Sequence, residues 1–378
     1  MATTVQKTVG ALATQAIETY LQKAESYEKP VIKDRDPENL HQMRISLRRL
    51  RTVMQVFAPG IFLPKAGSES QVSAISRHLG KLRDLDVIAA VLQEQYLPDL
   101  PHIERDILSI VFNYLKKKRK KAYKQTKSTL KSNRYKAFKT SLYQWVLNPD
   151  CNQTARLEID TVLPDLTLPL VSHLWLHPGW LVEVKSMTGK LKPDTHLSAD
   201  EVDIAVVTHS DTLHSLRKQV KRVRYQLRVV SAFYGDRLKE DLANLSDLQD
   251  TLGTLQDTLV MKDFLHQAMP KWETKLPTLK ALLKDSRHRA WQQWQTLQQH
   301  YLTPKHRETL RQLLMHPGAD DFLPETNSKK APPKAHQPLA EKPSAKASEA
   351  KKPTVQESPP TSETDSDTDS DTDKTADA

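Results

Sequence analysis

The sequence predicts an all-α protein built from a duplicated helical unit. The chain has 378 residues with only 9 Gly, and its polar residues are mostly the good helix formers Lys, Arg, Glu and Gln. Apolar residues recur at a spacing of three and four, whereas no stretch alternates for long enough to predict a strand. One helical pattern also returns after 173 residues, which indicates an internal repeat.

The apolar spacing places helices, separated by prolines, along the first half. They are expected over residues 5–27, 39–57, 68–95, 102–131 and 134–147. Ser132-Asn133 provides a cap for the last of them. A Pro-containing connecting segment is expected over about 148–200. Its residues 157–184 could contain a short strand, which their prolines disfavour. The second half, about 200–316, should repeat the plan of the first.

Residues 324–378 predict a disordered tail. They are rich in Pro, Ala, Ser, Thr, Lys and acids and contain almost no large apolar side chains. Such a segment cannot bury enough apolar surface to offset its loss of conformational entropy. It ends in the acidic run SETDSDTDSDTDKTADA. The tail is either a passive solubilising segment or an internal competitor for a basic surface.

Composition excludes several classes of protein. The single cysteine, Cys151, excludes an internal disulfide framework and a multi-cysteine metal cluster. The N-terminal residues lack a signal-peptide pattern, and no apolar window is long enough to span a membrane. We therefore expect a soluble, cytoplasmic protein with no membrane partner.

Positive charge is concentrated in one part of the chain. The formal net charge is +10, and residues 41–145 contain 21 Lys and Arg against 7 Asp and Glu. Concentrated cations are typical of proteins with a polyanionic partner, such as nucleic acid, an anionic membrane or polyphosphate.

The repeat consists of two segments that share one offset. HQMRISLRRLRTVMQVF, from His41, aligns with HSLRKQVKRVRYQLRVV, from His214. Further on, HLGKLRDLDVIAAVL aligns with TLGTLQDTLVMKDFL, so that Gly80 corresponds to Gly253. Chance similarity between two basic helices would not keep the same offset through both segments, so we infer a duplication.

Each copy of the first segment predicts a helix with a stripe of cations opposite its apolar side. The first stripe contains His41, Arg44, Arg48 and Arg51, and the second contains His214, Arg217, Lys221, Arg224 and Arg228. An ordinary solvated face mixes charges, because like charges three and four residues apart destabilise a helix. Residues 41–68 contain no Asp or Glu, which favours a ligand that supplies the negative charge. Protonation of the two histidines would then raise the affinity as the pH falls through about 6.5.

A lysine-rich helix is the third basic element. Residues 116–136 contain no acid. One side of the helix carries Lys117, Lys120, Lys121, Lys124, Lys127 and Lys131. Lysine suits phosphate as a mobile point charge, and arginine suits it as a planar fork. The alternative is a nonspecific basic patch.

Asp84 and Asp86 are a close carboxylate pair beside the basic region. They could hold Mg²⁺ or act as acid and base, but we expect them to orient neighbouring arginines through charge-assisted hydrogen bonds. The sequence lacks the phosphate-loop, dinucleotide, zinc-protease, hydrolase and EF-hand patterns. We therefore expect no catalytic residue, no metal site and no cofactor.

The duplicated pattern H-x-x-R-x-x-x-[RK]-R-x-R, followed by L-G-x-x-[RQ]-D, resembles the CHAD family, the conserved histidine α-helical domain. The resemblance covers about residues 5–316. It implies two four-helix bundles related by a pseudo-two-fold axis, with a central basic groove between them. It also implies binding of inorganic polyphosphate and an association with polyphosphate granules and their enzymes.

The candidate polyphosphate-binding residues come from the two stripes, the L-G segment and the lysine-rich helix. They are His41, Arg44, Arg48, Arg49, Arg51, Lys81, Arg83, Lys117, Lys120, Lys121, Lys124, Lys127, Lys131, His214, Arg217, Lys218, Lys221, Arg222, Arg224 and Arg228.

Our expectation is a noncatalytic polyphosphate-binding module. An RNA- or DNA-binding protein shares the charge but needs aromatic or base-reading side chains on the same face, where Tyr225 is the exception to a scarcity of aromatics. A metal-dependent enzyme acting on polyphosphate or triphosphates would use Asp84 and Asp86. A phosphorelay protein would use His41, but the sequence has no kinase or receiver pattern.

Overall fold

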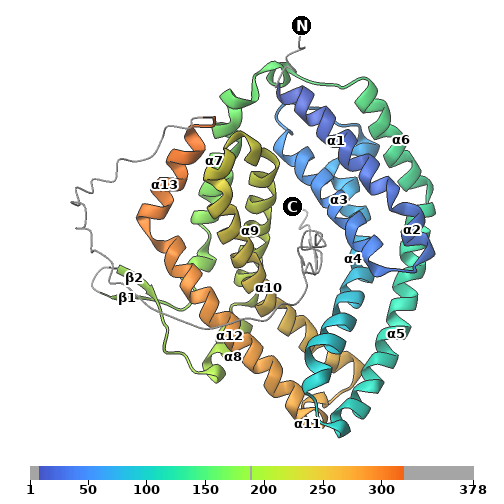
Figure 1. The fold of residues 1–378 in the computed structure, drawn as a ribbon, viewed down its shortest axis with the longest axis vertical. Helices are drawn as coiled ribbons and strands as arrows, with labels where there is room; N and C mark the ends of the chain where they lie inside the picture. Colours follow the sequence, from blue (N-terminus) through green and yellow to red (C-terminus); the bar gives the residue numbers. More distant parts are fainter. Residues whose placement is uncertain (1–7, 188–189, 319–378) are drawn as a thin grey trace, which may run out of the picture. The chain divides into compact units, whose positions relative to one another are not determined.

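Helices form nearly all the regular structure of this protein. The computed structural model describes residues 8–187 and 190–318 (Figure 1). The all-α prediction is confirmed, and no helix within those residues is long and apolar enough to cross a membrane. The predicted tail, 324–378, lies outside the described residues.

The helices of the first half follow the sequence pattern closely, except for the short α2, which was not predicted. They are α1 (Val9–Ser26), α2 (Glu28–Lys33), α3 (Pro37–Val56), α4 (Glu69–Ala90), α5 (His102–Lys131) and α6 (Asn133–Leu147). The end of α4 continues as a π-helical turn over Val91–Tyr96. The predicted cap of α6 is present, since the Ser132 hydroxyl accepts a hydrogen bond from the backbone N–H of Tyr135 at 3.2 Å.

The connecting segment contains a helix and a hairpin, and the second half follows with the remaining helices. They are α7 (Ile159–Trp175), β1 (Val184–Met187), β2 (Lys190–Pro193), α8 (Ala199–Thr208), α9 (Ser210–Val230), α10 (Lys239–Ala268), α11 (Trp272–Lys275), α12 (Pro277–Leu302) and α13 (Pro304–Met315). The capping box of α8 joins Ser198 and Glu201, whose side chains each accept from the other's backbone N–H.

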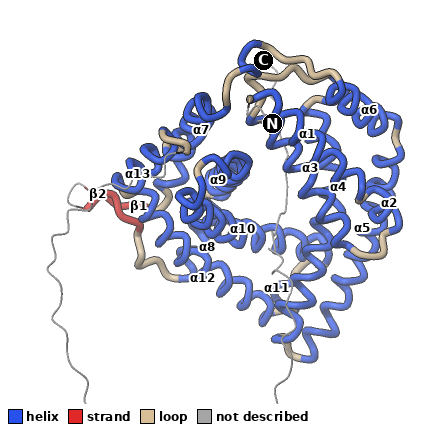
Figure 2. Tube along the Cα trace, turned by 45° about the horizontal axis from the view of Figure 1, so that its top comes forward, coloured by secondary structure: helices blue, strands red, loops and turns tan. Residues whose placement is uncertain are grey.

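The segment expected to connect the halves contains more structure than its prolines suggested. Helix α7 contains Pro164 and Pro169, and burial of Leu163 and Leu174 favours the helix despite the lost backbone donors. The expectation of no strand was wrong, because β1 and β2 pair antiparallel (Figure 2). Pro193 ends β2 at the edge of this two-stranded sheet, where proline is tolerated.

The apolar sides of α3 and α9 lie in the main core. Met43, Leu47 and Leu50 of α3 are completely buried, as are Leu216 and Leu227 of α9. Full burial of each such side chain contributes about 1.5–3 kcal/mol. Helix α3 packs against α1 and α4, and α9 packs against α7 and α10. The helical spacing of apolar residues in both copies therefore reports their packing correctly.

A second, smaller core joins elements of the two halves. It contains Leu92 and Leu108 from the first half and Leu265, Trp272 and Leu279 from the second. Figures 1 and 2 show α5 approaching α10, α11 and α12 in this region. The two halves are therefore in contact both here and where α3 meets α9.

Candidate functional site

Contact between α3 and α9 brings the two copies of the basic segment together. Helix α3 begins after Asp36, whose carboxylate accepts from the backbone N–H of Glu38 at 2.8 Å, with Pro37 in the first turn. Gln226 of α9 donates to the side-chain oxygen of Gln55 of α3 at 3.5 Å. The cationic residues on these helices consequently lie around one shared space.

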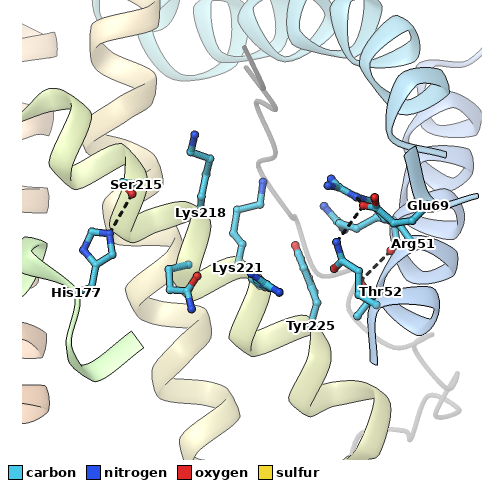
Figure 3. A pocket seen from close by; sticks show the side chains of 12 residues that line it. Arg51, Thr52, Glu69, His177, Ser215, Lys218, Lys221 and Tyr225 are labelled. Carbon is cyan, nitrogen blue, oxygen red and sulfur yellow. Dashed lines mark hydrogen bonds and ion pairs between the residues drawn. The ribbon is translucent and has the colours of Figure 1, made fainter. Parts of the chain in front are cut away.

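That space is a cavity of about 440 Å³ between α3 and α9. Its lining residues are Arg48, Arg51, Thr52, Gln55, Glu69, His177, Ser215, Lys218, Gln219, Lys221, Arg222 and Tyr225. Figure 3 shows Lys218, Lys221 and Tyr225 on α9, with Arg51 and Thr52 of α3 across from them.

The cavity lining is strongly cationic. Two arginines come from α3 and three cations from α9, whereas Glu69 is the one carboxylate among the twelve lining residues. Glu69 forms an ion pair with Arg51 and accepts from the amide of Gln55 at 3.0 Å. Like charges held this close repel one another, so the cavity favours an anionic occupant.

Tyr225 connects cations from both copies. Its ring centroid lies 4.4 Å from the guanidinium carbon of Arg48 and 5.6 Å from that of Arg224. A guanidinium over an aromatic face is stabilised by the ring quadrupole. Tyr225 therefore holds Arg48 at the cavity wall. A nucleic-acid base would need the same ring for stacking, and the guanidinium already contacts it.

Most residues of the two cation stripes do not line the cavity, although the sequence predicted that the stripes face an anionic ligand. His41, Arg44, Arg217, Lys221 and Arg224 are all buried. Helix α4 packs over α3, and α10 packs over α9, so these side chains lie between helices. Of these five buried residues, the cavity is lined by Lys221 alone.

Room for the buried arginines comes from the glycines of the repeated L-G pattern. A Cβ on Gly80 would stand 2.8 Å from Nη1 of Arg44, and one on Gly253 would stand 3.3 Å from Nη2 of Arg217. Arg44 donates to the backbone carbonyl of Ser76 at 2.9 Å. The two copies thus make corresponding arginine–glycine contacts, which is a packing role for four residues of the repeat.

The histidines that open the two stripes are not part of the cavity wall. His41 is buried, His214 is half-buried, and neither lines the cavity. The expected increase in affinity on their protonation stays a prediction.

The remaining predicted residues lie away from the cavity. Arg49 is half-buried, with its guanidinium carbon 6.0 Å from the Tyr20 ring centroid, and Arg228 is exposed. Lys81 is exposed, and Arg83 is half-buried, where burial lowers its pKa. The candidate lysines of α5 are exposed, except for a half-buried Lys127, and none lines the cavity. The structure therefore does not bring the lysine-rich helix to the α3–α9 cavity.

Asp86 orients an arginine, as the sequence predicted, whereas the same role for Asp84 stays a prediction. Arg119 donates from Nε to Asp86 at 2.6 Å and from both terminal nitrogens to Asp34 at 2.8 Å. Burial raises the pKa of Asp86, while the charge of Arg119 acts in the opposite direction. Within residues 8–187 and 190–318, no group of three or more His, Cys, Asp or Glu is placed to hold a metal ion.

Sequence reasoning missed six polar lining residues, which are Thr52, Gln55, Glu69, His177, Ser215 and Gln219. Glu69 is the first acid after Glu38, so its place at the end of an acid-free run could have indicated its role. Ser215 lies between two stripe residues of α9, and its neutral side chain gave no sequence signal of a role in the site. His177 comes from the connecting segment, and only tertiary packing reveals its approach to α9.

A comparison with protein-family models now decides the family. The model of the CHAD domain matches residues 15–266. This chain belongs to the CHAD domain family. The matched residues include both copies of the repeat and all twelve residues of the cavity lining described above.

Two solved structures resemble this one. PptA from Streptomyces chartreusis aligns with a TM-score of 0.56 and 16% identity, covering 77% of this chain and 99% of that chain. The CHAD domain from the plant Ricinus communis aligns with a TM-score of 0.48 and 22% identity, covering 83% of this chain and 94% of that chain. The likeness to PptA supports a shared fold. No curated protein matches the sequence.

Proposed function

We propose that this CHAD protein binds inorganic polyphosphate in the cavity between α3 and α9, without catalysing a reaction on it. One observation carries the proposal: five cationic side chains from both repeat copies line one cavity that contains a single carboxylate. A linear chain of phosphates would neutralise these charges and release its condensed counterions.

The details of the lining favour a phosphate chain over a nucleic acid. Arginine forks and lysine ammonium groups both suit phosphate oxygens. Single-strand binding proteins add aromatic platforms on which bases stack. Tyr225 is the one Phe, Tyr or Trp residue of this lining, and its ring already contacts Arg48. Polyphosphate granules and the enzymes that act on them are the partners that this function implies.

A competition titration tests the proposal. Labelled long-chain polyphosphate would compete with single-stranded RNA, duplex DNA and ATP for the full chain at about 150 mM salt, near physiological ionic strength. We expect a strong preference for polyphosphate. Equal affinity for the nucleic acids would contradict it and would identify the cavity as a general polyanion site.

The noncatalytic part needs a separate assay. Phosphate release from polyphosphate and from ATP would be measured with and without Mg²⁺. We expect none, because Asp86 is engaged by Arg119 and lies outside the cavity lining. Release that depends on Mg²⁺ would overturn this and direct attention to Asp84 and Asp86.

A further inference from the structure

One wall of the cavity carries a neutral histidine–serine pair. His177 precedes a 3₁₀ turn over Pro178–Leu181, and Ser215 lies in the second turn of α9. Nε2 of His177 is 3.0 Å from the hydroxyl oxygen of Ser215, and both residues line the cavity (Figure 3). Neither belongs to the cation stripes.

The second ring nitrogen determines the direction of this hydrogen bond. Nδ1 of His177 accepts from the backbone N–H of Gly179 at 3.0 Å. A backbone amide can only donate, so Nδ1 carries the lone pair and the neutral ring has its hydrogen on Nε2. His177 therefore donates to Ser215, and its ring offers the serine no lone pair with which to act as a general base. The pair is not an activated nucleophile.

The serine hydroxyl still has its own hydrogen to give. Within residues 8–187 and 190–318, His177 is the only hydrogen-bond partner of the Ser215 side chain. Because Ser215 accepts from His177, its O–H can donate in another direction. Ser215 is exposed and lines the cavity one turn before Lys218, so an oxygen of an anion in the cavity is a suitable acceptor.

We propose that Ser215, held in place by His177, is a neutral hydrogen-bond donor to a phosphate oxygen of bound polyphosphate. This inference rests on the proposed function. The cations attract negative charge anywhere in the cavity. The Ser215 hydroxyl instead requires an acceptor oxygen at one place on the cavity wall.

The segment that carries His177 is fixed before any ligand arrives. A Cβ on Gly179 would stand 2.9 Å from Cβ of Leu216, the residue after Ser215, so only glycine allows this approach to α9. The buried indole of Trp180 donates to the carbonyl of Leu174 at 2.6 Å. Gln298 donates to the carbonyl of Trp180 at 2.9 Å. A donor that is already positioned loses little entropy on binding.

Salt dependence distinguishes a neutral donor from a cation. The full chain and its Ser215→Ala variant would be titrated with labelled long-chain polyphosphate over a series of salt concentrations. We expect Ser215→Ala to weaken binding about 3- to 10-fold, the effect of one hydrogen bond, with an unchanged slope of log affinity against log salt. Lys218→Gln is the matched charged control. Its plot of log affinity against log salt should become shallower by about 0.7, by analogy with single-stranded nucleic acid.

Two further variants separate the hydroxyl from the packing. Ser215→Thr keeps the hydroxyl and should keep an affinity within about twofold of wild type. His177→Ala should also weaken binding, and the double variant should be no weaker than Ser215→Ala, because His177 acts through the serine. Thermal unfolding of Ser215→Ala should match wild type, since the side chain is exposed.

The possible outcomes distinguish failure of the Ser215 donor role from failure of the proposed function. If wild type binds polyphosphate and Ser215→Ala binds equally well, the donor role is wrong and the proposed function stands. A changed salt slope in Ser215→Ala would also overturn the donor role. If wild type does not bind polyphosphate, both proposals fail.

Discussion

The guanidinium of Arg44 lies directly against Gly80, so that a Cβ at this glycine would be 2.8 Å from Nη1. Arg44 is only 7% exposed and donates to the carbonyl of Ser76. In the second copy, Arg217 makes the corresponding contact with Gly253 at a longer 3.3 Å. The glycine of the repeated L-G pattern is therefore a packing requirement of the buried arginine.

This contact predicts that Gly80→Ala is destabilising. Alanine adds about 1 kcal/mol of helix propensity, but displacing a buried, hydrogen-bonded guanidinium costs about 1–3 kcal/mol. We expect a net loss of about 1 kcal/mol in the free energy of unfolding, measured with urea. Gly253→Ala is the matched control and should lose less, because its closest contact is longer. A larger loss at Gly253 would contradict the packing explanation.

Glu104→Ala should be one of the most destabilising single changes. The buried Glu104 of α5 accepts from the backbone N–H groups of Thr278 at 2.9 Å and Leu279 at 3.2 Å. It thereby caps α12, whose own N-cap side chain makes no such bond. Leaving buried donors unpaired costs about 1–3 kcal/mol each, so we expect a loss of about 2–4 kcal/mol in urea unfolding.

Glu104→Gln provides the comparison. It keeps one acceptor oxygen and nearly the same volume, so it should be less destabilising than Glu104→Ala. Equal effects of the two variants would show that packing volume, and not the cap, is what Glu104 contributes.

Removal of the cavity carboxylate should tighten polyphosphate binding. Glu69 neutralises Arg51 at the wall, and Glu69→Gln would leave that charge available to the ligand. We expect about a 2- to 5-fold gain in affinity, in line with the small energies of partly exposed ion pairs. The gain should be greatest at low salt.

Glu18→Gln makes the same charge change on α1, outside the cavity lining. It should leave the affinity nearly unchanged. An equal gain in both variants would mean that net charge, and not the position of Glu69, sets the affinity.

Asp241 should make stability depend on pH in the direction opposite to an ordinary carboxylate. Burial raises the pKa of Asp241 from 3.8 to about 6. Because its pKa is raised in the folded state, Asp241 contributes its full stabilisation at a pH below the pKa of the unfolded state. This stabilisation is lost as the pH rises through about 6. The free energy of unfolding of Asp241→Asn, relative to wild type, should therefore increase between pH 4 and pH 6.

His306 gives the mirror image of this test. Its Nε2 lies 3.9 Å from a carboxylate oxygen of Asp241, and burial lowers its pKa from 6.5 to about 4. The folded state binds fewer protons than the unfolded state between these values, so wild type gains stability as the pH rises. His306→Asn should lose stability relative to wild type over the same interval. Parallel curves for a variant and wild type would refute the assignment for that residue.

Deletion of residues 324–378 tests the tail as an internal competitor. The segment carries 11 acids against 8 lysines and ends in an aspartate-rich run. If it competes for the cationic cavity, the shortened chain should bind polyphosphate more tightly, with the difference decreasing as salt increases. Unchanged affinity at low salt would leave the tail as a passive segment.

The helical class and the resemblance to the CHAD family could be predicted from the sequence, which also indicated an internal repeat. Apolar spacing gave the bounds of α5 and α6 almost to the residue, because burial of one side repeats with the helical period. The pairing of His41 with His214, at an offset shared by Gly80 and Gly253, indicated the duplication. These properties follow from the spacing of residue types along the chain, which can be read without a structure.

Which cations line a cavity and which are buried between helices depends on tertiary packing. A helical projection separates polar from apolar sides, but it does not show that α4 covers Arg44 or that α10 covers Arg217. A helical projection also does not predict the hydrogen bond between His177 and Ser215, because that contact depends on how the connecting segment packs against α9. Burial and contact are set by neighbouring helices that are distant in sequence, and the physical environment of each charge follows from them.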